Sequence, residues 1–112
     1  MPFLSYFITP HGLKEYEPKT FKEKIASNKY AVIDVRTEME FSHGHIEGAR
    51  HLPLKHVKKN IKNLDREKGY MLVCATGHRS RAAATILLKN GFQDVSHLKG
   101  GMIAWNRHFS KK

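Results

Sequence analysis

The sequence predicts an α/β fold with about five strands, mainly parallel, and with helices on both faces of the sheet. Short apolar runs alternate along the chain with segments of helical periodicity, which is the pattern of successive β-α-β units. The chain has 112 residues, of which 40% are hydrophobic and 27% charged, as expected for one globular domain. No internal repeat and no linker rich in proline, glycine or serine divides it.

Five short segments are predicted to be strands. AVIDV at 31–35 and YMLV at 70–73 are the most apolar and are predicted to be buried. HLPL at 51–54 contains Pro53, which indicates an edge strand or a strand end because proline has no N–H for the ladder. VSHL at 95–98 is a fourth strand, and LKEY at 13–16 is a weaker fifth.

Helical periodicity predicts helices over 18–26, 56–64, 81–90 and 102–109. Pro18 suits the first turn of the first helix, and Phe21 and Ile25 then share its inner face. The second helix is basic, with its apolar residues inward and its lysines outward. Gly91 supplies a left-handed stop for the third helix, and Phe92 is expected to pack back on it.

Residues 1–12 are predicted to be an apolar extension of a domain over 13–112. The extension begins MPFLSYFI, which lacks a basic leader and is far shorter than the roughly 20 apolar residues that span a bilayer. Cys74 is the only cysteine, so no internal disulfide forms, and a free thiol fits a reducing compartment. We therefore expect a cytoplasmic protein with no membrane association.

The net charge of +10 favours anionic partners. Basic residues gather around the second predicted helix: Lys55, Lys58, Lys59, Lys62, Arg66 and Lys68. No motif for RNA or DNA accompanies them, and aromatic residues are not interleaved for base stacking. This predicts a solvated basic face or, if the face binds something, an acidic protein partner rather than nucleic acid.

The eight histidines raise the question of a metal. His43 and His45 lie two apart in the turn SHGHIEGA, but no cysteine or carboxylate set at zinc spacing joins them. We expect these histidines to hold loop geometry, and we expect neither a metal nor a cofactor. Trp105 is interpreted as a core residue.

The candidate site is the segment that follows the strand at 70–73. Parallel sheets bind ligands at the carboxyl ends of their strands, and Cys74 lies at such an end. A tight loop of small residues can turn successive N–H groups inward as an anion nest, and a helix that begins near Arg79 adds positive partial charge. These features favour a thiolate. The candidate residues are Cys74, Ala75, Thr76, Gly77, His78, Arg79 and Ser80.

A lone cysteine at a strand end is often only a small buried hydrophobe. Here a glycine, two small residues, His78, Arg79 and a helix start all coincide, and their coincidence favours a functional site. Arg79 and His78 are expected to contribute charge rather than proton transfer, with Arg79 binding oxyanion oxygens or a supporting carboxylate.

The segment CATGHR resembles the C-x-x-G-x-R active-site loop of single-domain rhodanese-like sulfurtransferases. VIDVRTEMEFSHGHIEGARHLPL is similar to the first motif of that family, and HLKGGMIAW to its C-terminal motif. The resemblance covers residues 13–109. His51 departs from it, because the family often has asparagine there, at the end of a strand rather than in the loop.

The resemblance implies a rhodanese-like fold and a sulfane-sulfur transfer cycle. Cys74 would attack a donor such as thiosulfate and become a persulfide, which the N–H groups from Ala75 to about Ser80 would cradle. Cyanide or a thiol would then accept the sulfur. Asp34 and Arg36, which follow a buried strand, are expected to form an ion pair that supports the site.

Two alternatives remain. One is a non-catalytic or sulfur-relay module that binds a protein partner, although inactive modules of this kind typically lack the cysteine. The other is a cysteine phosphatase or arsenate reductase, which would use C-x5-R to fit the larger phosphoryl group. Arg79 gives C-x4-R and Arg81 gives C-x6-R, so neither spacing matches.

Overall fold

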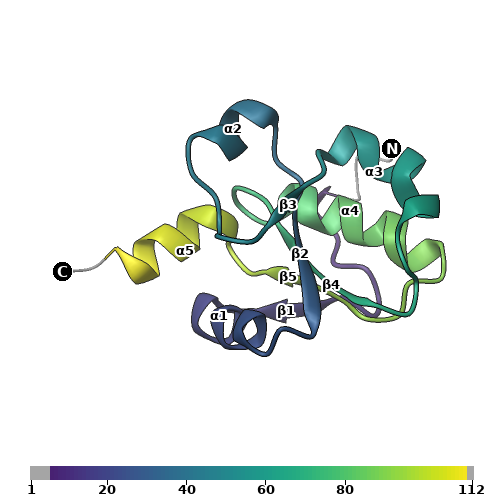
Figure 1. Cartoon of the computed structure of the whole chain (residues 1–112), viewed down its shortest axis with the longest axis horizontal. Helices are drawn as coiled ribbons and strands as arrows, with labels where there is room; N and C mark the ends of the chain where they lie inside the picture. The colour runs from purple at the N-terminus through teal and green to yellow at the C-terminus, as the bar shows by residue number, and fades with distance from the viewer. Residues whose placement is uncertain (1–5, 111–112) are drawn as a thin grey trace.

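The computed structural model describes residues 6–110 and contains one five-stranded sheet with helices on both sides (Figure 1). The strand order is β1-β5-β4-β2-β3, and every pairing is parallel. The predicted α/β class is therefore confirmed. The strands are β1 (Lys14–Tyr16), β2 (Tyr30–Asp34), β3 (Arg50–His51), β4 (Gly69–Val73) and β5 (Val95–Leu98). The helices are α1 (Pro18–Ala26), α2 (Glu38–Ser42), α3 (Leu54–Asn60), α4 (His78–Lys89) and α5 (Gly101–Phe109).

The sheet separates two hydrophobic cores. Side chains alternate along β4, so Leu72 and Cys74 belong to one core while Met71 and Val73 belong to the other, as the period of two along a strand requires. Helices α3 and α4 cover the first core, and α1 and α5 cover the second (Figure 1). The thiol of Cys74 therefore faces the side of the sheet that α4 covers.

Three predicted boundaries were wrong. The helix expected over 56–64 is instead α3 over 54–60, followed by a short 3₁₀ helix over 61–63. The segment 51–54 is not a strand throughout: β3 ends at His51, and Pro53 precedes α3 as its N-cap, because a residue without an N–H can begin a helix more easily than continue a ladder. Helix α4 begins at His78, three residues before the start of the periodic pattern at 81 and one before the helix start expected near Arg79. His78, Arg79 and Ser80 therefore already lie in the first turn of α4.

Other local predictions are confirmed. Gly91 has a positive φ of 90°, and Phe92 donates its N–H to the Leu87 carbonyl at 3.2 Å while its ring packs edge-on against Tyr70. Trp105 is half-buried and packs edge-on against Phe21 in the second core. One short helix, α2, was not among the predicted ones.

The N-terminal extension predicted at 1–12 lies partly outside the described residues, since residues 1–5 are not described. In the described part, the ring of Phe7 lies 5.3 Å from that of His78. The domain boundary at residue 13 stays a prediction. Among residues 6–110, no helix is long and apolar enough to cross a membrane.

The register of the sheet brings two loops together at its carboxyl edge. Asp34 of β2 is level with Val73 of β4, and the Val35 N–H donates to the Val73 carbonyl at 2.9 Å. The segment after β2 therefore leaves the sheet beside the segment that carries Cys74. On the other side of β4, His97 of β5 is level with Leu72 and with Glu15 of β1.

Candidate active site

Cys74 lies directly after β4 and is 1% exposed. The N–H of Gly77 donates to Sγ at 2.9 Å, and Sγ lies 3.4 Å from the hydroxyl oxygen of Ser80. Gly77 has φ of 108° and is the N-cap of α4, a conformation that residues with a Cβ rarely adopt. The sulfur therefore lies at the amino end of a twelve-residue helix, where the backbone dipoles favour negative charge.

The first turn of α5 hydrogen-bonds to the backbone carbonyls of the loop that begins at Cys74, called the cysteine loop. Its Met102 N–H donates to the Cys74 carbonyl at 2.8 Å, and its Ile103 N–H donates to the Ala75 carbonyl at 3.1 Å. In a trans peptide the C=O and the next N–H point in opposite directions, so the N–H groups of Ala75 and Thr76 are turned away from α5. The amino end of α5 thus fixes the orientation of these two N–H groups.

Close approach of α5 to the loop depends on Gly101. Its φ is 61°, and a Cβ at this position would fall on the backbone carbonyl of Ala75 and 2.6 Å from the Cys74 carbonyl oxygen. Backbone cannot move aside as a flexible side chain can. The second glycine of the KGG segment is therefore required by the packing of α5 against the active-site loop.

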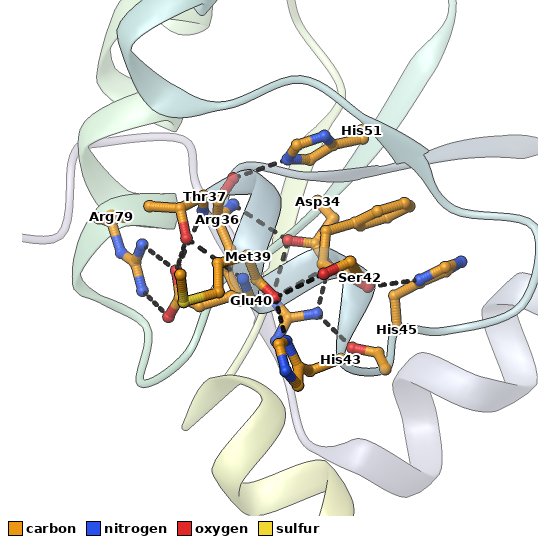
Figure 2. A network of polar contacts seen from close by, with 12 residues as sticks. Asp34, Arg36, Thr37, Met39, Glu40, Ser42, His43, His45, His51 and Arg79 are labelled. Carbon is orange, nitrogen blue, oxygen red and sulfur yellow. Dashed lines mark hydrogen bonds and ion pairs between the residues drawn. The ribbon is translucent and has the colours of Figure 1, made fainter.

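Arg79 forms a bidentate ion pair with Glu40 of α2 (Figure 2). The two guanidinium nitrogens donate to the two carboxylate oxygens at 2.7 and 2.8 Å. The hydrogen bonds from Arg79 are the main reason that the pKa of Glu40 falls to about 2, and the same bonds raise the pKa of Arg79. Arg79 thus has a supporting carboxylate within the site, which is one of its two predicted uses.

Glu40 is held for this contact by α2. Its side chain accepts from the N–H of Thr37, and the Thr37 hydroxyl accepts from the N–H of Glu40, which is a capping box. The capping box fixes the start of the helix, so Oε1 of Glu40 accepts from both Thr37 and Arg79 while Oε2 accepts from Arg79. Helix α2 is short and has no periodic apolar face toward the core, so its capping box is what orders it.

Asp34 and Arg36 form the predicted ion pair (Figure 2). Both are buried, and the closest approach, between Arg36 Nη2 and Asp34 Oδ2, is 2.8 Å. Arg36 Nη2 also donates to the carbonyl of Gly44 at 2.8 Å. Loss of either partner would leave a buried charge uncompensated, which is strongly destabilising. The pair ties the segment after β2 to the loop after α2.

The histidines of that loop bond to the backbone, as expected. Nδ1 of His43 lies 2.7 Å from the Met39 carbonyl oxygen, and Nδ1 of His45 lies 2.8 Å from that of Phe41 (Figure 2). No group of three or more potential metal-binding residues occurs among residues 6–110. His51, the departure from the family pattern, stacks on Phe41 and contacts the Arg36 carbonyl at 2.8 Å.

Thr76 and His78 lie at the exposed rim of the loop, with Thr76 Oγ1 3.4 Å from His78 Nδ1. Beside the rim is a cavity of about 1140 Å³ between α3 and α4. Arg79 lines it, as do Lys55, Lys58 and Lys89, above apolar residues such as Ile86. The cavity is therefore lined by basic residues where it borders Arg79, and Cys74 is not part of its lining.

Sequence reasoning missed two residues near the thiol, His97 and Glu15. His97 is buried and contacts Ser80 on one side and Glu15 on the other. Ser80 was predicted for its backbone N–H, whereas the contact with the sulfur in the structure comes from its hydroxyl. The contact between Glu15 and His97 follows from the pairing of β1 with β5, the contact between Ser80 and His97 lies between α4 and β5, and no local pattern signals either.

A family model described as a rhodanese-like domain matches residues 17–108 of this chain. The chain belongs to the rhodanese-like family. It is 36% identical over 92 residues to the thiosulfate sulfurtransferase GlpE of Pseudomonas putida, which covers 82% of this chain and 84% of that protein.

Solved structures agree with this assignment. A rhodanese-related protein of Thermoplasma volcanium has a TM-score of 0.78 and 29% identity, covering 86% of this chain and 93% of that one. The human single-domain sulfurtransferase TSTD1 has a TM-score of 0.77 over 83% of this chain and 95% of its own, with 18% identity, and so shares the fold. The predicted rhodanese-like fold is confirmed.

Proposed function

We propose that this rhodanese-like protein is a sulfurtransferase that moves sulfane sulfur from thiosulfate, or a similar anionic donor, to cyanide or a thiol through a persulfide on Cys74. The observation that carries the proposal is the surroundings of Sγ. A backbone N–H donates to it at 2.9 Å, at the amino end of α4 and inside a loop whose carbonyls α5 engages. The name of the Pseudomonas putida relative supports the donor.

In the first half-reaction the Cys74 thiolate attacks the outer sulfur of thiosulfate. A sulfur–sulfur bond forms to Cys74, the bond to the sulfonate sulfur breaks, and sulfite leaves with its electron pair. The persulfide carries one negative charge, which the loop N–H groups from Ala75 to Ser80 and the dipole of α4 stabilise. Cyanide or a thiolate then takes the outer sulfur and restores the thiolate, so one difficult transfer becomes two easier ones.

The loop favours sulfur over a phosphoryl group. Cys74 and Arg79 are separated by four residues, and Gly77 closes the loop directly onto Sγ. A tetrahedral oxyanion attacked by the thiolate needs a wider ring of donors. Asp34 and Arg36 are site-supporting residues in this proposal, because they fix the segment beside the loop rather than contact the sulfur.

The acceptor side is proposed to be anionic. The cavity beside Arg79 has lysines on α3 and α4, and the chain has a net charge of +10. Electrostatic attraction of this kind raises association rates and is reduced by salt. An acidic protein that accepts the sulfur would fit this face, in which case the module acts in a sulfur relay and activity with small acceptors would be slow.

The test is intact-protein mass spectrometry after incubation with thiosulfate, followed by addition of cyanide. We expect the protein to gain the mass of one sulfur atom, to lose it on addition of cyanide, and to release thiocyanate. Cys74→Ser should gain nothing and should retain its fold by circular dichroism. A wild-type protein that gains no sulfur, or a serine variant that still forms thiocyanate, would contradict the proposal.

A further inference from the structure

His97 lies on β5, an interior strand of the sheet, is 0% exposed, and uses both of its ring nitrogens. Nδ1 lies 2.6 Å from Ser80 Oγ, and Nε2 lies 2.8 Å from Glu15 Oε2. Ser80 Oγ in turn lies 3.4 Å from Cys74 Sγ. The side chains of Ser80 on α4 and His97 on β5 therefore connect the only thiol of the chain to a partly exposed carboxylate on β1.

Hydrogen-bond chemistry determines where the protons lie in this chain. The Glu15 carboxylate only accepts, so Nε2 of His97 must carry a proton and donate to it. In a neutral imidazole, Nδ1 is then an acceptor, and the Ser80 hydroxyl donates to it. The lone pairs of Ser80 remain free to accept the S–H of Cys74. Every donor from the thiol to Glu15 has an acceptor in this arrangement.

A second arrangement satisfies the same groups with the charges separated. If the thiol proton moves to Ser80 Oγ and the Ser80 proton moves to Nδ1, the sulfur becomes a thiolate and His97 becomes an imidazolium. Nδ1–H now donates to Ser80. The Ser80 hydroxyl donates to the sulfur or to the Gly77 carbonyl, which lies 3.0 Å away. Apart from the two proton transfers, the second arrangement requires only rotation of the Ser80 hydroxyl.

We propose that His97 accepts the thiol proton of Cys74 through Ser80, and that Glu15 orients the imidazole and stabilises it when charged. This inference rests on the proposed function in one respect, namely that the thiolate is the reacting species. His97 and Glu15 touch neither sulfur nor substrate, so they are positioning residues, and the relay sets how much of Cys74 is ionised at neutral pH.

Charged groups of both signs face His97. Burial and the charge of Arg81 lower the pKa of His97, whereas the hydrogen bond and the charge of Glu15 act in the opposite direction, so Glu15 is the group that favours the charged imidazole. The hydrogen bond from His97 lowers the pKa of Glu15, with help from Arg81 of α4, 3.7 Å away, and from Lys99. The groups that face His97 are thus Glu15 on β1, Ser80 and Arg81 on α4, and Cys74 after β4.

A purely structural role for His97 would need only its two hydrogen bonds and no basicity. His97→Asn separates the two roles, because the amide oxygen can still accept from Ser80 near the position of Nδ1 but cannot take its proton. Glu15→Gln keeps an acceptor for Nε2 and removes the charge that stabilises the imidazolium. Glu15 is partly exposed, so this variant should fold even if substitutions at buried His97 or Ser80 do not.

The experiment follows the ultraviolet absorbance of the thiolate in substrate-free protein between about pH 5 and pH 9, a range that spans the reference pKa values of histidine and cysteine. The spectrum of Cys74→Ala is subtracted, which isolates the single thiol. Glu23→Gln on α1 is the matched control, because it removes the same charge from an exposed position far from the relay. Circular dichroism confirms the fold of each variant.

We expect the thiolate to form at higher pH in His97→Asn, in Ser80→Ala and, to a smaller extent, in Glu15→Gln, with no change in Glu23→Gln. A free thiol is only a few per cent ionised at pH 7, so the loss in kcat/KM at that pH should reach up to about 30-fold in His97→Asn. The loss should disappear at alkaline pH, where the thiol ionises without a relay.

The thiolate titration separates this inference from the proposed function. Titration curves of Glu15→Gln and His97→Asn that superimpose on the wild-type curve would overturn the relay, even if the protein transfers sulfur. Shifted curves in a protein that gains no sulfur from thiosulfate would support the relay and contradict the function. A uniform loss of activity at every pH, with unshifted titration, would show that His97 is only structural.

Discussion

Glu40→Gln should destabilise the protein at neutral pH by removing the carboxylate that forms an ion pair with Arg79. The pair is bidentate, at 2.7 and 2.8 Å, and it joins α2 to the first turn of α4. Glutamine preserves the capping box with Thr37, because either residue serves at that position. The substitution therefore removes the ion pair while leaving the local helix signal in place.

The size of the effect follows from the pKa of Glu40, which falls from its ordinary value of 4.5 to about 2. At 1.36 kcal/mol per pKa unit, this difference corresponds to roughly 3 kcal/mol. The Glu40 side chain is 34% exposed, and solvent screening reduces such values strongly. We therefore expect Glu40→Gln to lower the free energy of unfolding by about 1–2 kcal/mol at pH 7.

The pH dependence has a definite sign. Because the folded pKa of Glu40 is depressed, the stabilisation is fully present above the unfolded value near 4.5 and is lost as the pH falls toward the folded value. Urea unfolding of the wild type and of Glu40→Gln should therefore differ by a constant amount from neutrality down to about pH 5. The difference should drop to less than half by about pH 3.

Glu38→Gln is the control, since it removes a carboxylate from the first turn of the same helix without a contact to Arg79. We expect Glu38→Gln to lower the free energy of unfolding by only the few tenths of a kcal/mol typical of a charge at a helix terminus. A difference between wild type and Glu40→Gln that is the same at pH 3 as at pH 7 would refute the reasoning, and so would equal effects of the two substitutions.

Three further predictions concern the cysteine loop. Gly101→Ala should lower the free energy of unfolding by at least about 2 kcal/mol and remove most of the sulfur transfer. Gly48→Ala is the control, because Gly48 has a positive φ of 87° but open space around it, and it should show only the backbone strain of about 1 kcal/mol. Equal losses of the two variants in urea unfolding would contradict the proposed collision with Ala75. Arg79→Ala should raise the KM for thiosulfate, and His78→Ala should matter less and mainly at lower pH; unchanged kinetics of Arg79→Ala would rule out its charge as a contributor. A glycine inserted between Gly77 and His78 should reduce sulfur transfer by orders of magnitude and introduce weak phosphatase or arsenate reductase activity, measured with p-nitrophenyl phosphate and arsenate; a native protein that already hydrolyses the ester as well as it transfers sulfur would show that loop length does not discriminate.

The sequence predicted those parts of the fold that depend on local patterns. Five strands, the helices over 18–26 and 102–109 and the stop at Gly91 all follow from side-chain periodicity and backbone preference within one element. The Asp34–Arg36 pair could also be predicted, because two residues that flank the end of a buried strand have few other partners. The periodic pattern placed the start of α4 three residues late because Gly77, its N-cap, carries no side chain to cap it, although the cysteine loop had indicated a helix start near Arg79.

Contacts between distant segments could not be predicted in the same way. Glu40 and Arg79 lie 39 residues apart, and Glu15 and His97 lie 82 apart. Their meeting depends on which strand pairs with which and in what register. A one-residue shift in a strand would turn its side chains to the opposite face. His97 within VSHL therefore gives no sign in the sequence that it faces α4 and the thiol.

The three sequence motifs act on one loop through different physical means. The first motif, after β2, supplies Glu40, whose charge holds the first turn of α4 through Arg79. The C-terminal motif supplies the N–H groups of α5, which fix the Cys74 and Ala75 carbonyls, and also the buried imidazole of His97 behind Ser80. Carbonyls held on one side direct N–H groups to the other, and in the proposed relay the imidazole beyond Ser80 accepts the thiol proton. If Cys74 is the nucleophile that we propose, substitutions at Gly101, Glu40 or Glu15 should change the chemistry of a sulfur that none of these residues touches.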